Sequence, residues 1–154
     1  MNLVVLKKSR RQPAAGDIFV MKPGRTPFLF GRVIKTDANA GGFPNANLIY
    51  IYKFRSMSKE VDVELHPDGL LLPPIMTNNL PWSRGYFEYV GNRQLQAGDC
   101  LARHCFRDER GWYFDETGKR LRSPVDPIGE WGLHSFRTID DAISIALGVP
   151  LSDR

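Results

Sequence analysis

The densest group of chemically reactive side chains lies near residue 100, where the sequence is Asp99-Cys100-x-x-x-His104-Cys105. Carboxylate, thiol and imidazole are the groups that zinc sites and cysteine nucleophiles use. The spacing opposes both uses, because on a strand Cys100 and His104 lie on one face and Cys105 on the other. The pattern therefore favours a packed cysteine beside a hydrogen-bonded histidine, and we expect no catalytic residues, metal or cofactor there.

Five candidate ligands for a hard cation lie close together in the sequence: Glu60, Asp62, Glu64, His66 and Asp68. They do not follow the ligand spacing of a calcium loop. Residues 61–65 alternate apolar and charged side chains, which predicts a strand with one wet face and makes this group a solvated surface. The sequence also lacks a nucleophile elbow, a phosphate-binding loop, a zinc-protease motif and a dinucleotide fingerprint.

Two groups combine aromatic and basic side chains. Tyr50, Tyr52 and Phe54 share one strand face, with Lys53 and Arg55 beside them. Such a face could stack the bases of a single-stranded nucleic acid. A packed barrel core gives the same pattern, and the core interpretation is favoured.

The second group is Trp82, Arg84 and Tyr86, at the end of a proline-rich segment that covers residues 73–82. Trp, Tyr and Arg are the commonest anchors of protein interfaces, although they also seal the edges of cores. If the segment binds a partner, we expect the contacts to come from Asn78, Asn79, Trp82, Arg84 and Tyr86.

Arg32 is a permanent charge inside the apolar run Phe30-Gly31-Arg32-Val33-Ile34. A guanidinium in such a run needs a partner or a route to water. We expect a structural ion pair with a carboxylate, or bonds to backbone carbonyls. Gly31 allows a close approach or a bend of the strand.

Most of the elements that would position these residues are predicted to be strands. The predicted strands are residues 17–21, 28–34, 47–54, 61–65, 86–90, 101–106, 112–115 and a short one near 132–136. Two Asp-Glu-x-Gly turns, at 108–111 and 115–118, predict an antiparallel meander. Residues 37–46 are expected to form a mobile loop.

One helix is predicted near the C-terminus. Thr138 is a suitable N-cap with Asp141 at capping-box spacing, an apolar stripe follows, and Gly148 can end the helix. The predicted fold is mainly β (α+β): a small antiparallel, SH3-like or partly open barrel with a meander and one C-terminal helix. We expect a basic N-terminal arm or extra strand at 1–15, a single β-rich domain at 16–148 and a tail at 149–154.

Charge is unevenly distributed along the chain. The whole sequence carries a formal net charge of +4, but residues 1–35 hold eight Lys and Arg against one Asp. The N-terminal segment could therefore meet phosphate or an acidic protein, although a solvated, partly flexible arm at Lys7–Arg11 is favoured. No apolar run is long enough to span a bilayer, and no secretory pattern is present, so we expect a cytoplasmic protein without membrane contact.

An ordered set of short motifs covers most of the chain. The motifs are Gly16-Asp17-Ile18-Phe19, Phe30-Gly31-Arg32-Val33-Ile34, Ile49-Tyr50-Ile51-Tyr52, Pro73-Pro74-Ile75, Trp82 with Gly85-Tyr86-Phe87, Cys105-Phe106 and Gly129-Glu130-Trp131-Gly132. From about Gly16 to Leu147 the chain resembles the bacterial immunity protein 26 family, some of whose members also carry a phosphotriesterase label.

The resemblance implies a non-enzymatic antitoxin of a polymorphic toxin system, which binds a cognate toxin domain, possibly a nuclease, and blocks it. The sequence pI of about 9.2 differs from the acidic character common in immunity proteins against nucleases. Either the acidic part after residue 35 binds the toxin, or the toxin is not a basic nuclease. Two alternatives stay open: a phosphotriesterase-like hydrolase, and a small barrel that binds nucleic acid.

Overall fold

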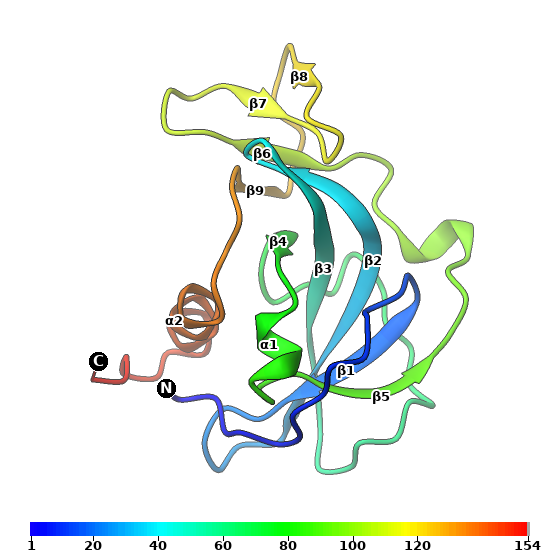
Figure 1. The fold of residues 1–154 in the computed structure, drawn as a ribbon, viewed down its shortest axis with the longest axis vertical. Helices are drawn as coiled ribbons and strands as arrows, with labels where there is room; N and C mark the ends of the chain where they lie inside the picture. Colours follow the sequence, from blue (N-terminus) through cyan, green and yellow to red (C-terminus); the bar gives the residue numbers. More distant parts are fainter. Residues whose placement is uncertain (154) are drawn as a thin grey trace.

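The computed structural model describes residues 1–153, and it is mainly β with one C-terminal helix, as predicted (Figure 1). The main sheet has five strands in the order β4-β3-β2-β1-β5. Its strands are β1 (Asp17–Met21), β2 (Phe28–Ala40), β3 (Phe43–Ser56), β4 (Ile75–Thr77) and β5 (Glu88–Asn92). Within residues 1–153 the strands do not close into a barrel.

A second, smaller sheet has four strands in the order β8-β7-β6-β9 and lies at one end of the molecule (Figure 1). Its strands are β6 (Cys105–Arg107), β7 (Tyr113–Phe114), β8 (Arg120–Leu121) and β9 (Ile128–Glu130). Strands β6, β7 and β8 form the predicted antiparallel meander, and β9 pairs with β6 in parallel. In each predicted turn the first Asp accepts backbone N–H groups, and the glycine has a left-handed φ.

Both faces of the main sheet are covered, which explains why its strands lack a polar alternation. One apolar cluster joins residues such as Ile18, Tyr50 and Tyr52 to Phe106 of the second sheet. The other joins Phe19 and Ile49 to the C-terminal helix α2 (Phe136–Leu147). Tyr50 and Tyr52 are almost fully buried, so this strand face belongs to the core, whereas Phe54 is 40% exposed at the strand end.

Strands β2 and β3 form one long hairpin, and the expected mobile loop at residues 37–46 is wrong. The strands continue to Ala40 and restart at Phe43, joined by Gly41 and Gly42. Both glycines have positive φ, 63° and 97°, as the two central residues of a type I′ turn require. The predicted strands were too short because the Gly-Gly pair makes a tight turn here and does not begin a loop.

Gly31 on β2 makes room for an aromatic ring. Phe19 on β1 is its direct partner across the strands, and a Cβ at Gly31 would come within 2.3 Å of the Phe19 ring. The ring also stacks on Phe87 at a centroid distance of 4.5 Å. The close approach expected at Gly31 is therefore made by a side chain and not by another backbone.

Two predicted strands are absent from the described residues. Residues 61–65 keep the alternating exposure, but the carbonyls of Val61 and Val63 accept hydrogen bonds from the Arg93 guanidinium, at 3.3 and 2.8 Å, in place of a neighbouring strand. Near 132–136 the chain makes only an isolated bridge between His134 and Thr77.

Residues 1–153 contain three helical elements: α1 (Leu80–Ser83), the 3-10 turn η1 (Ala97–Asp99) and α2. Helix α2 begins three residues earlier than predicted. Its N-cap is Ser135, whose hydroxyl accepts the Thr138 N–H at 3.2 Å, so the proposed capping box of Thr138 and Asp141 is wrong. The predicted end is confirmed, since Gly148 has a left-handed φ of 70°.

The N-terminal segment is anchored to the domain by its first residues, whereas Lys7, Lys8, Arg10 and Arg11 of the expected arm are exposed. Leu3 is 3% exposed, and both Asn2 and Leu3 donate backbone N–H groups to the buried Asp140 carboxylate of α2. Further along, Leu6 N–H donates to the Gly85 carbonyl at 2.8 Å. Asn2 Nδ2 also donates to the Pro150 carbonyl at 2.8 Å, so the start of the chain lies beside the segment that follows α2. Within residues 1–153 no helix has the length and apolar character needed to cross a membrane.

Candidate interaction site

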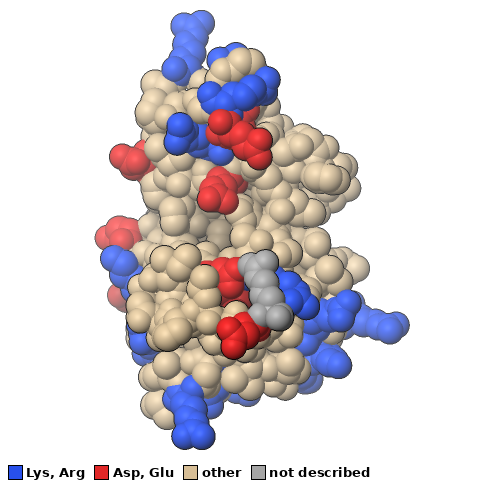
Figure 2. Space-filling model, turned by 90° about the vertical axis from the view of Figure 1, so that its left-hand side faces the viewer, with Lys and Arg blue, Asp and Glu red and all other residues tan. Residues whose placement is uncertain are grey.

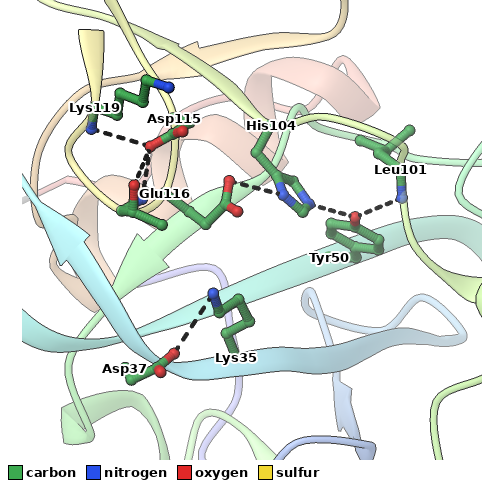
Figure 3. A network of polar contacts seen from close by, with 9 residues as sticks. Lys35, Asp37, Tyr50, Leu101, His104, Asp115, Glu116 and Lys119 are labelled. Carbon is green, nitrogen blue, oxygen red and sulfur yellow. Dashed lines mark hydrogen bonds and ion pairs between the residues drawn. The ribbon is translucent and has the colours of Figure 1, made fainter.

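A polar network connects the main sheet to the second sheet (Figure 3). The Tyr50 hydroxyl on β3 lies 2.6 Å from His104 Nε2, just before β6. His104 Nδ1 lies 3.1 Å from Glu116 Oε2, in the turn between β7 and β8. The phenol oxygen also accepts the Leu101 N–H at 3.0 Å. We therefore assign the Tyr50 hydroxyl as the donor to Nε2, and the Nδ1–H of His104 as the donor to the Glu116 carboxylate.

A carboxylate, an imidazole and a hydroxyl bonded in series, as in Glu116, His104 and Tyr50, could make the hydroxyl a nucleophile. The Tyr50 hydroxyl, however, is inaccessible to a substrate. Tyr50 is 0% exposed, and burial raises the pKa of its phenol. The hydrogen bond from His104 lowers the pKa of Glu116. A hollow of about 300 Å³ reaches His104 and Glu116 but not Tyr50. The geometry makes this network a link between the sheets.

The residues around Asp99 do not come together as one cluster. His104 faces Tyr50 and Glu116, whereas Asp99 pairs with Arg32. Cys100 and Cys105 are both free thiols, and burial raises the pKa of Cys100. The acidic group from Glu60 to Asp68 is mostly exposed, as predicted for a solvated surface. Among residues 1–153, no three His, Cys, Asp or Glu side chains are grouped to hold a metal ion.

Arg32 is buried inside the protein with a carboxylate and a carbonyl beside it. The side chain is 0% exposed, and its Nη2 donates to the Arg93 carbonyl at 2.6 Å. Its Nη1 lies 3.3 Å from Asp99 Oδ2. The pKa of Asp99 is lowered, first by the Gln96 backbone N–H and then by the Arg32 charge. Arg32 is therefore not part of an open groove.

In the predicted partner-binding segment, the two aromatic side chains face the protein interior and not a partner. Trp82 is 3% exposed and packs edge-on against Phe19 and Phe87, at 5.3 and 5.1 Å. It cannot anchor a partner from this position, because its ring already completes the core beneath α1. Tyr86 is half-buried and stacks on Phe136 of α2 at 5.2 Å.

The two asparagines of this segment hold the chain in place. Asn78 Oδ1 accepts the Leu80 N–H at 2.9 Å, and Asn79 Oδ1 accepts from Asn47 at 2.7 Å. Asn79 and Arg84 are exposed, whereas Asn78 is half-buried. Of the five predicted residues, Asn79 and Arg84 are thus the most available to a partner.

An apolar groove lies on the face that carries α2, between that helix, β9 and the segment before β4. Figure 2 shows this face hollowed at mid-height, with Asp and Glu beside the hollow and Lys and Arg projecting around the edges of the face. The groove has a volume of about 380 Å³. Its apolar lining includes Leu72, Ile75, Ile128, Ile139, Ala142 and Ile145.

The groove is acidic at its rim. Glu130 and Asp141 line it, together with His134, and its lining contains no Lys or Arg. Sequence reasoning missed this site because its walls come from three separate segments. Ile145 was a usable signal, because it is an apolar residue outside the apolar stripe of α2 and is left 69% exposed.

An exposed aromatic residue, Trp112, lies in the turn between β6 and β7. The ring of Trp112 is held between two guanidinium groups, Arg110 at 3.7 Å and Arg120 at 3.8 Å from the ring centroid. Trp112 is 37% exposed. Exposed cation–π contacts of this kind are worth about 0.5–1 kcal/mol each, so the ring is held in a defined orientation at the surface.

Comparison with known proteins identifies one family. The family model described as Immunity protein 26 matches residues 14–109. This range contains β1 to β6, the whole main sheet and the start of the second. Neither a search of curated proteins nor a search of solved structures returned a significant match. The match covers more than half of the sequence, and the chain belongs to the immunity protein 26 family.

Proposed function

We propose that this protein is a non-enzymatic immunity protein, which binds a cognate toxin domain of a polymorphic toxin system and blocks it in the cytoplasm of the producing cell. The observation that carries the proposal is the family match over residues 14–109. An immunity protein works by occupying a surface of its toxin, so its own surface has to offer a stable shape and exposed contact groups.

The structure supports a binding role in two ways. The main sheet is covered on both faces, the molecule has a pre-formed groove, and the second sheet presents an exposed aromatic side chain, Trp112. The groups best suited to acid–base chemistry, Tyr50, His104 and Glu116, are bonded to one another, and the phenol is fully buried.

The charged residues of this protein are unevenly distributed, which bears on the kind of toxin surface that it could meet. The chain as a whole carries +4, and much of its positive charge lies in the first 35 residues. Lys7, Lys8 and Arg10 in that segment are exposed. The groove is lined by Glu130 and Asp141 together with His134. If the toxin is a nuclease with a basic surface, the acidic part of the chain after residue 35 is the part expected to meet it.

Co-expression with the toxin domain encoded beside this protein tests the proposal. We expect the protein to restore growth and to co-purify with the toxin domain, while an unrelated toxin domain gives neither result. Absence of both growth rescue and a complex would refute the proposed function.

The alternatives make separate predictions in the same preparation. We expect no turnover of a chromogenic phosphotriester, and no binding to single-stranded DNA that weakens steeply with salt. Turnover that is lost in a His104→Ala variant would support the hydrolase alternative, and salt-dependent binding lost on replacing Lys7 and Lys8 would support the nucleic-acid alternative.

A further inference from the structure

Positive charge gathers where the N-terminal segment runs along α1. Lys7, Lys8 and Arg10 come from that segment and Arg84 from the end of α1, and these four residues are called the basic strip below. We propose that the basic strip is the contact surface for an acidic segment of the toxin domain. This inference rests on the proposed immunity function and adds to it a contact surface and the chemistry of the partner.

Backbone hydrogen bonds hold the N-terminal segment along α1 in the opposite chain direction (Figure 1). Leu6 N–H donates to the Gly85 carbonyl at 2.8 Å, and Ser9 N–H donates to the Trp82 carbonyl at 3.1 Å. The two backbones are in direct contact, because a Cβ at Gly85 would come within 3.1 Å of the Lys8 nitrogen. The strip therefore stands on an ordered backbone, which loses less conformational freedom on binding than a free arm would lose.

The charge of the basic strip is not neutralised inside the protein. All four side chains are exposed, and none of them forms an ion pair with a carboxylate of residues 1–153. The two stretches that supply the strip, residues 1–16 and 69–87, contain no Asp or Glu. Arg11 differs from the four strip residues, because it pairs with the buried Asp17. The strip thus offers its cations to a carboxylate from another molecule.

Exposed aliphatic side chains lie next to these cations. Val5 is 50% exposed and lies over Gly85, since a Cβ at that glycine would come within 3.0 Å of Val5 Cγ1. Leu80 is 41% exposed and precedes Arg84 by four residues, so the two lie on the same face of α1. A protein partner can cover such apolar groups while its carboxylates meet the cations around them.

The aromatic side chains nearby are not arranged to bind a nucleic acid. Proteins that bind single strands stack the bases on exposed rings. Here Trp82 is 3% exposed, and Tyr86 already stacks on Phe136 at a centroid distance of 5.2 Å. Tyr89 is 36% exposed, but the Arg11 guanidinium covers one face of its ring, 3.8 Å from the centroid. An acidic protein segment therefore fits this surface better than a nucleic acid does.

Opposite charges across an interface raise the association rate and disfavour wrong partners, and salt weakens both effects. An acidic toxin segment would be steered to the basic strip, and a basic segment would be repelled from it. This partner also accounts for the sequence pI of about 9.2, because the excess positive charge serves the contact.

The test measures the affinity of the purified toxin domain for matched double variants by titration calorimetry. Lys7→Glu with Arg84→Glu reverses two charges of the strip. Lys53→Glu with Arg122→Glu makes the same change in net charge at exposed residues outside it. We expect the strip variant to weaken binding at least about tenfold and to lose much of the salt dependence, and the control variant to stay within about twofold of wild type.

The outcomes separate this inference from the function on which it rests. If the wild-type protein binds the toxin domain and the strip variant binds as tightly as the control variant, the strip is not the contact surface, although the immunity function stands. If the wild-type protein does not bind, the proposed function fails and this inference fails with it. Circular dichroism checks folding, and Lys7→Gln with Arg84→Gln replaces the strip variant if that variant unfolds.

A single-stranded DNA oligonucleotide is the competing ligand in the same assay. We expect it to bind wild type and strip variant equally weakly. Oligonucleotide binding that is lost in the strip variant while toxin binding stays intact would overturn the inference, because the strip would then be a nucleic-acid site.

Discussion

The Tyr50 hydroxyl lies 2.6 Å from His104 Nε2, and this contact joins the centre of the main sheet to the segment that enters the second sheet. The two residues are 54 positions apart in the sequence. His104 is in turn hydrogen-bonded to Glu116, which lies in a turn of the second sheet. The relative position of the two sheets therefore depends on a buried polar link as well as on apolar packing.

Removing the Tyr50 hydroxyl should destabilise the protein, because His104 and the Leu101 N–H would each lose a buried partner. We expect Tyr50→Phe to lower the free energy of unfolding by about 1–3 kcal/mol. Tyr52→Phe is the matched control, since Tyr52 is equally buried and its hydroxyl has no hydrogen-bond partner in the structure. It should change the free energy of unfolding by less than about 0.5 kcal/mol. Equal losses in urea unfolding would contradict the role of the link.

The Glu116 carboxylate should make stability fall in acid. Its pKa in the folded protein is held below the ordinary value of 4.5 by the hydrogen bond from His104. The unfolded chain therefore takes up the proton first as the pH falls, so this stabilisation is present above about pH 4.5 and is lost through the folded pKa. The difference in unfolding free energy between wild type and Glu116→Gln should shrink from pH 5 downward. A difference that stays constant from pH 5 to pH 3 would contradict this assignment.

Trp82 should matter for stability, since its ring fills the core between Phe19 and Phe87. We expect Trp82→Ala to cost about 3–5 kcal/mol of unfolding free energy. Trp112→Ala, at a surface ring held between two arginines, should cost only about 1 kcal/mol. Thermal unfolding of the two variants distinguishes them. A small effect at Trp82 would return this residue to the list of partner contacts.

The N-terminal segment should detach when Asp140 is replaced. The Asp140 carboxylate is 1% exposed and accepts the N–H groups of Asn2 and Leu3 at 3.1 and 2.7 Å. In Asp140→Ala we expect faster hydrogen exchange at Val4 and Leu6, whose N–H groups bond to Lys22 and Gly85. Asp68→Ala, at an exposed side chain, is the control. Unchanged protection would mean that other contacts hold the segment.

Much of the sheet architecture could be predicted from local patterns. The apolar run Asp17–Met21 and the two Asp-Glu-x-Gly turns produced a strand and a meander where they were expected. Residues 61–65 show the limit of such patterns. Their alternating exposure is real, but the Arg93 guanidinium takes the place of a strand partner, and no local pattern reveals a contact across some 30 residues.

The candidate site was harder to predict, because it too depends on contacts between segments that are distant in the sequence. The groove is assembled from residues near 75, 130 and 140, which approach only because β9 pairs in parallel with β6 and α2 packs on the main sheet. Trp82 showed the opposite problem. An aromatic residue after a proline-rich segment has the composition of an interface anchor, and only its contacts with Phe19 and Phe87 show that it faces inward.

The most direct test of the immunity function is a titration of the isolated toxin domain with this protein, with the toxin's own activity as the readout. The account predicts that activity falls in proportion to the added protein and is abolished near a stoichiometric ratio. A denatured sample of the protein is the control and should leave the activity unchanged. A toxin domain that keeps full activity in a large excess of folded protein would contradict the account.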